Sequence, residues 1–151
     1  FAVGLGSDMN FGNGFTVAGD ATAIARYDAS GDISWARALT TVAGEAASIS
    51  SITTSYDGEL WVAGYFSSST LTLDGFTLTN TASSSAFLAR LNNSGTVVFA
   101  IAWGGDDDSF TYAADICTDG LDGVCVIGHS AASSLAIGEV TLTNPTIAGQ
   151  L

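Results

Sequence analysis

The sequence predicts an all-β protein built from propeller-like repeats, on the strength of three observations. One phrase recurs after 64 residues, since residues 23–27 (AIARY) return as residues 87–91 (FLARL), with Arg26 matched to Arg90. Alternation with a period of two, the signal of β-strands, runs through the chain, and helical periodicity is almost absent. Turn dipeptides such as Asp57-Gly58 separate the alternating segments. A fixed period that carries its turn residues with it is typical of repeat architectures.

One complete repeat is expected at residues 40–103. Its predicted elements are, in order, a first strand at 46–56, a second at 59–66, a Ser/Thr-rich minor hairpin at 69–80, a third strand at 85–92 and a fourth at 96–103. Four antiparallel strands in a meander describe one blade of a β-propeller. The first strand is rich in small residues, which suits the crowded inner position of a blade, and the fourth is rich in aromatic residues, which suits the outer one.

The two ends of the chain hold partial repeats. Residues 1–39 match the last three strands of a blade, and residues 104–151 match the first two strands of another blade with its minor hairpin. The chain therefore spans about 2.4 blades, whereas closed propellers have roughly four to eight. Because open sheet edges associate readily, we expect a window of a longer repeat array, completed by further repeats of the same chain or by neighbouring copies of it.

Three segments carry a resemblance to a known family: residues 31–36 (GDISWA), 56–64 (YDGELWVAG) and 85–91 (SAFLARL). They resemble the SBBP-type β-propeller repeats of extracellular and surface proteins. Residues 103–108 (WGGDDD) look like the Gly-Gly-x-x-Asp loop of that family, although the matching loop at 39–45 holds a single acid. The resemblance covers nearly the whole chain. It implies a propeller fold and an extracellular or cell-surface location, and it implies no particular activity, since propellers host many.

The charge balance limits the choice of partners. The 151 residues include 15 acidic and three basic ones, for a net charge of −12. Such a surface repels nucleic acids and anionic membranes. No stretch of 18 apolar residues occurs, so no membrane-spanning helix is expected. The acidity suits an extracellular or high-salt setting and attracts Ca²⁺; solubility alone is the other explanation.

A run of three acids, Asp106, Asp107 and Asp108, is the sharpest local feature. Hard carboxylate oxygens on a loop suit Ca²⁺, and these residues are a weak candidate site for it. The spaced acidic pattern of a dedicated calcium loop is missing, so a solvated acidic turn is the alternative. No other cofactor is expected.

The two cysteines, Cys117 and Cys125, flank a turn-rich stretch between two expected strands. They could face each other across a hairpin, where a disulfide would be possible. The alternative is that both are small buried hydrophobic residues, because free cysteine packs well in cores.

No catalytic constellation is present in the sequence. His129 is the only histidine, and no serine stands in a nucleophile-elbow context beside it. We therefore expect a structural or surface role for His129 and no enzymatic activity.

Glycans are a further expectation. Asn92-Asn93-Ser94 is an N-glycosylation sequon at an expected hairpin tip, with Asn92 as the acceptor. Serine and threonine clusters such as residues 67–70 suit either O-glycosylation or ordinary turn chemistry.

Four aromatic residues leave two interpretations open. They form either a sugar-binding platform or part of the core, and their repeat-matched strand positions favour the core. These residues are Trp35, Trp61, Phe99 and Trp103.

These observations together predict a non-enzymatic extracellular repeat protein. The leading hypothesis is a surface scaffold, or a filament or surface-appendage building block, with an adhesive role and with copies of itself or further repeats as its partners. The alternative is a ligand-binding propeller whose loops at 40–45 and 104–109 hold a carbohydrate or a protein with the help of Ca²⁺.

Overall fold

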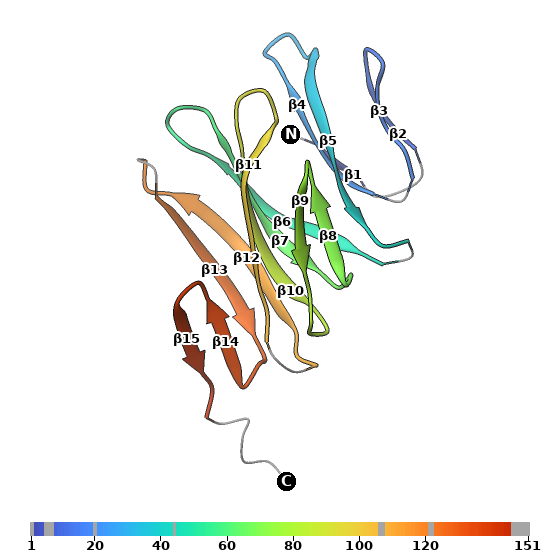
Figure 1. The fold of residues 1–151 in the computed structure, drawn as a ribbon. Coiled ribbons are helices and arrows are strands. Elements are labelled where there is room, and N and C mark those ends of the chain that lie inside the picture. Colours follow the sequence, from blue (N-terminus) through green and yellow to red (C-terminus); the bar gives the residue numbers. More distant parts are fainter. Residues whose placement is uncertain are drawn as a thin grey trace.

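All regular structure in the described residues is β-strand. The computed structural model describes residues 2–4, 8–19, 21–43, 45–105, 108–120 and 123–145. The named strands of this part of the chain pair in antiparallel sheets (Figure 1). None of the described residues belongs to a helix that could cross a membrane. The predicted all-β class is confirmed.

The first sheet joins strands from two successive repeats. Its order is β1 (Ala2–Gly4), β4 (Thr22–Tyr27), β5 (Ile33–Thr41), β8 (Thr70–Leu73) and β9 (Phe76–Thr79). A separate hairpin is formed by β2 (Met9–Gly12) and β3 (Phe15–Val17). The hairpin β8–β9 lies in the predicted complete repeat, yet β8 pairs with β5 of the repeat before it. Neighbouring repeats are thus joined by backbone hydrogen bonds.

The second sheet contains the four strands predicted for the complete repeat. Its order is β11 (Val97–Trp103), β10 (Ser85–Leu91), β7 (Leu60–Phe66) and β6 (Ala47–Thr54). Their bounds agree with the predicted ones to within two residues. Gly58 in the turn between β6 and β7 has a φ of +85°, the conformation that a hairpin turn requires and that glycine adopts without steric strain.

Two further hairpins follow in the last repeat. One is formed by β12 (Thr111–Thr118) and β13 (Val124–Ser130), and the other by β14 (Ser134–Ile137) and β15 (Val140–Thr143). They correspond to the first two strands and the minor hairpin expected within residues 104–151.

The 64-residue step is also present in the strand registers. In β10–β11, Ala86 pairs with Trp103, and a bulge interrupts the pairing between Arg90 and Leu91. In β4–β5, Thr22 pairs with Leu39, and the bulge falls between Arg26 and Tyr27. Each position differs by the same 64 residues. The sequence repeat therefore corresponds to a repeat of the strand pairing in the structure.

The glycines near the ends of β7 and β13, Gly64 and Gly128, are required by close packing. A Cβ atom on Gly64 would lie 1.9 Å from the Ser48 carbonyl oxygen on the neighbouring strand. A Cβ on Gly128, one repeat later, would lie 2.3 Å from the Tyr112 carbonyl oxygen. Both glycines sit beside a bulge in the first strand of their repeat, where two backbones come too close for any side chain.

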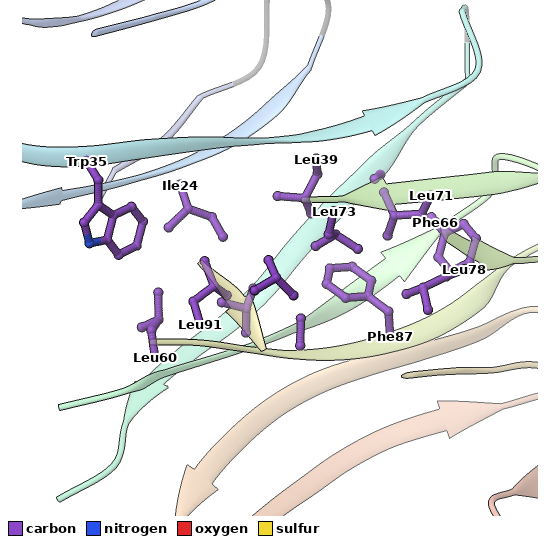
Figure 2. Packing of buried hydrophobic residues seen from close by; sticks show 14 residues of the cluster. Ile24, Trp35, Leu39, Leu60, Phe66, Leu71, Leu73, Leu78, Phe87 and Leu91 are labelled. Carbon is purple, nitrogen blue, oxygen red and sulfur yellow. The ribbon is translucent and has the colours of Figure 1, made fainter. Parts of the chain in front are cut away.

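The main core lies between the first and the second sheet. Figure 2 shows Ile24, Trp35 and Leu39 of the first sheet facing Leu60, Phe87 and Leu91 of the second. The minor hairpin closes this core at one side with Leu71, Leu73 and Leu78. A smaller cluster, which includes Trp61, Leu88 and Ile116, lies between the second sheet and the hairpin β12–β13. The second sheet therefore packs against other strands on both faces, as the apolar character of both faces of its strands predicted.

Candidate interaction groove

The last repeat leaves an open apolar groove of about 610 Å³. Its walls come from β10 and β11 on one side, β12 and β13 on another, and the hairpin β14–β15 on a third. The large apolar side chains that line it include Leu88, Trp103, Val126, Leu135, Ile137 and Leu142. We call this feature the β13 groove.

The apolar lining of the β13 groove is accessible to solvent. Val126 is 37% exposed, Ile137 39% and Leu142 54%. Grouped exposure of large apolar side chains is typical of interaction surfaces, since soluble proteins rarely leave such residues together in water. Among the described strands, β13 pairs only with β12, so its other edge also offers free backbone hydrogen-bonding groups.

Two rings stack at the rim of the β13 groove. His129 lies parallel to Tyr112, with ring centroids 5.6 Å apart and an interplanar angle of 23°. Tyr112 in turn meets Tyr65 edge-on, with ring centroids 6.3 Å apart. His129 therefore has a ring-packing role on an exposed surface, in agreement with the structural or surface role expected for it.

The acidic run has only one member in the described part of the chain. Asp106 and Asp107 lie outside the described residues. The backbone carbonyl of Asp108 accepts a hydrogen bond from the Ser83 hydroxyl at 2.9 Å. Within the described ranges, no three His, Cys, Asp or Glu side chains gather in a way that could hold a metal ion. The calcium site stays a prediction.

Cys117 and Cys125 are direct cross-strand partners in the hairpin β12–β13. The hairpin arrangement expected from their spacing is confirmed. Both side chains are exposed, so the alternative interpretation as buried hydrophobic residues is wrong. The reason is that these positions lie on a hairpin whose β13 strand is exposed along nearly its whole length. The two thiols are free in the structure, and the disulfide itself stays a prediction.

Asn92 begins the turn between β10 and β11. Its side-chain oxygen accepts hydrogen bonds from the backbone N–H groups of Ser94 and Thr96, each at 3.0 Å. The side chain of the next residue, Asn93, reaches Arg26 of the preceding repeat at 3.0 Å. This turn therefore bridges two repeats, and glycosylation at Asn92 stays a prediction.

The four aromatic residues do not form one platform. Trp35 and Trp61 are buried, as the core interpretation predicted. Phe99 is 38% exposed and meets Trp61 edge-on with ring centroids 6.0 Å apart. Trp103 lies in the wall of the β13 groove. Arg90 covers the Trp61 ring at 5.5 Å and forms an ion pair with Glu59 at 3.4 Å, so a side chain of the protein itself occupies this ring face.

Comparison of the sequence with protein-family models and with curated proteins returned no match.

The β13 groove was not foreseen from the sequence. A signal for it was nevertheless present, because the lining residues lie 64 positions after residues of the main core. Adding 64 to the residue numbers of the main core would thus have predicted the apolar lining of the groove. Among the described strands, no counterpart of β10–β11 covers that lining.

Proposed function

We propose that this chain is a non-enzymatic structural repeat protein whose sheets are blades of a propeller-like array. A four-stranded antiparallel sheet with a minor hairpin between its second and third strands supports this assignment. So does the way in which β8 of one repeat pairs with β5 of the repeat before it. The proposal includes membership of the SBBP-type repeat class that the sequence resembles.

Contacts between first strands support the same arrangement. The Ser51 hydroxyl of β6 donates a hydrogen bond to the Asp115 carboxylate of β12 at 2.6 Å, and these residues are 64 positions apart. The Thr118 hydroxyl donates to the Thr54 carbonyl at 3.3 Å, again across 64 positions. Equivalent positions of successive repeats thus touch along their first strands. Blades arranged around a common axis bring their innermost strands together in this way.

One observation carries the proposed role as an assembly unit. The β13 groove reproduces the wall of the main core, but several of its apolar residues, among them Val126, Ile137 and Leu142, are exposed to solvent. A module that exposes such a face is stabilised by association with more protein of matching shape. We therefore assign the chain to an extracellular or cell-surface scaffold, filament or surface appendage with an adhesive role, in which the partner is a further repeat or another copy.

The acidic surface is compatible with this role. With 15 acidic and three basic residues, the exposed faces repel nucleic acids and anionic membranes and keep the assembly soluble. Glycans on exposed turns would add to that solubility.

Ligand binding has less support. The β13 groove does carry polar side chains in its lining, such as Thr111, His129 and Ser130, as a small-molecule site would. Most of its lining residues nevertheless stand 64 positions after residues of the main core, which favours a protein segment as the occupant. The Ca²⁺-assisted form of this alternative depends on Asp106 and Asp107, which lie outside the described residues.

Electron microscopy of the protein from its native source tests the proposed function. We expect regular fibres or sheets in which each propeller-like unit abuts the next. Discrete closed particles without contacts between units would contradict the assembly role and would make the ligand-binding alternative the better assignment.

A further inference from the structure

The β13 groove matches the main core residue by residue. Ten of the buried residues in that core come from strands other than β10 and β11. Nine of these ten have their counterpart, 64 positions later, in the wall of the groove. Examples are Ile24 with Leu88, Leu39 with Trp103, Val62 with Val126, Leu73 with Ile137 and Leu78 with Leu142.

The main core and the β13 groove differ in how much of the equivalent side chains is exposed to solvent. Val62 is 0% exposed and its counterpart Val126 37%, while Leu78 is 9% exposed and its counterpart Leu142 54%. The remaining buried residues of the main core are Phe87, Ala89, Leu91 and Val97, and all four belong to β10 and β11. The strand pair β10–β11 is therefore the element that closes the main core, and its counterpart over the groove is not among the described strands.

The backbone gives the same result. Strand β7 pairs with β6 along one edge and with β10 along the other, where the register runs from Ser85 opposite Phe66 to Leu91 opposite Leu60. Strand β13 is the counterpart of β7 and pairs with β12, the counterpart of β6. Its second edge, which corresponds to the β10 side of β7, has no described partner strand.

We propose that the β13 groove is the docking surface for a β-hairpin equivalent to β10–β11. The first strand of this hairpin pairs antiparallel with the second edge of β13. The apolar side chains of the hairpin at the positions of Phe87, Ala89 and Leu91 fill the groove. This inference rests on the proposed function, since it names the partner that a structural repeat would take at its open face. Edge-strand addition supplies the backbone hydrogen bonds, and alternate side chains supply selectivity.

The lining also indicates how the incoming hairpin must be shaped. Phe66, which meets Phe87 edge-on in the main core, is replaced in the groove by Ser130. Leu39 is replaced by the larger Trp103. Relative to the main core, the side-chain volume is smaller on the β13 wall of the groove and larger on the β11 wall. Because the two changes are opposite in sign, a hairpin of nearly the same side-chain volume as β10–β11 fits.

Binding in trans tests the proposal. The probe is a soluble carrier protein fused to residues 82–105 of this chain, which include β10 and β11. We expect saturable binding to the intact protein, together with slower amide hydrogen exchange along β13. A carrier with Phe87→Asp and Leu91→Asp should bind at least ~10-fold more weakly, because burying unpaired carboxylates is costly.

Matched variants of the intact protein locate the contact. Val126→Asp, inside the groove, should weaken binding by at least ~10-fold. Val98→Asp changes a valine of similar exposure that does not line the groove, and should leave binding unchanged.

A second measurement covers the case in which the isolated hairpin does not fold on its carrier. Residues 146–151 of the chain are replaced by a copy of residues 82–105, which restores the 64-residue register. Amide exchange along β13 should slow in this chain, and should not slow when the copy carries the two aspartates.

Three results would overturn the proposal. One is failure of both the carrier and the lengthened chain to protect β13. Another is a concentration-dependent dimer that buries the groove and ignores the carrier, which would make a second copy of the whole chain the occupant. The third is an apolar dye held in the groove that the carrier cannot displace, which would indicate a small-molecule site. Native fibres, combined with failure of both the carrier and the lengthened chain to protect β13, would refute this inference alone. Protection of β13 combined with discrete native particles would refute the proposed function alone.

Discussion

The Ser51 hydroxyl and the Asp115 carboxylate, equivalent positions of two successive repeats, are joined by a hydrogen bond of 2.6 Å. This bond lowers the pKa of Asp115 below its ordinary value, and the backbone N–H of Ile116 adds to the effect. The same interface contains the bond from the Thr118 hydroxyl to the Thr54 carbonyl. Contact between these repeats therefore combines polar bonds between the first strands with an apolar cluster, in which Ile116 of β12 meets Trp61 of β7 and Leu88 of β10.

Removing the Ser51 hydroxyl should raise the pKa of Asp115. In Ser51→Ala, the carboxylate loses the larger of the two hydrogen bonds that favour its charged form, so its pKa should move back toward the ordinary value near 3.8. An NMR titration of the side-chain carboxyl carbons measures this directly. Asp57, whose pKa is lowered chiefly by Ser55, is the internal control and should titrate as in the unchanged protein.

The same contact gives a pH dependence of stability with a defined sign. Because the folded-state pKa of Asp115 is below the unfolded one, its contribution is present above the unfolded pKa, near 3.8, and is lost as the pH falls through the folded pKa. The unchanged protein and Ser51→Ala should therefore become more alike in unfolding free energy as the solution is acidified below about pH 4. A stability difference that stays constant from pH 7 to pH 2 would contradict this assignment.

The turn glycines Gly31 and Gly95 occupy equivalent positions but should respond differently to alanine. Both have positive φ, +87° and +76°, so alanine is strained at either site. Only at Gly95 does a new Cβ meet a neighbour, since it would lie 2.5 Å from the Trp35 ring. Gly95→Ala should therefore cost about 1–3 kcal/mol more than Gly31→Ala in urea unfolding. Equal losses would show that Trp35 does not pack on this turn.

Much of the architecture was predictable from the sequence because turns and repeats constrain the chain locally. Asp57-Gly58 requires a backbone that reverses direction, and this fixes where β6 ends and β7 begins. The 64-residue step then transfers that register to the other repeats, including the hairpin that brings Cys117 opposite Cys125.

The exposure of individual side chains was less predictable. Alternation identifies which residues share a face of a strand, but it does not say which other sheet covers that face. Trp61 is buried because β12 and Arg90 cover it, whereas Phe99, on the outermost strand of the same sheet, is half-exposed. The β13 groove escaped prediction for the same reason, since Val126 differs from Val62 only in what lies over it.

Oxidation should join Cys117 and Cys125 within one molecule. Directly opposed residues of an antiparallel pair have Cα atoms about 4.5–5.5 Å apart, which is within the range of disulfides. Mild oxidation should lower the mass by that of two hydrogen atoms and stabilise the hairpin by about 2–3 kcal/mol, and dithiothreitol should reverse both changes. Cys117→Ser is the control and should show neither. If oxidation yields only cross-linked dimers, the geometry of this pair is unsuitable.

Equivalent leucines of the complete repeat and the open one should differ in their contribution to stability. Leu78 is 9% exposed in the main core and Leu142, 64 positions later, is 54% exposed in the β13 groove. Leu78→Ala should cost about 2–5 kcal/mol, because it removes buried methyl groups and leaves a cavity. Leu142→Ala should cost less than about 1 kcal/mol, because much of that side chain already contacts water. In the chain lengthened by residues 82–105, the hairpin covers Leu142, and the cost of Leu142→Ala should rise toward that of Leu78→Ala. Urea unfolding of each substitution in each of the two chains measures this change. A cost for Leu142→Ala that stays the same in both chains would show that the added hairpin does not reach the groove.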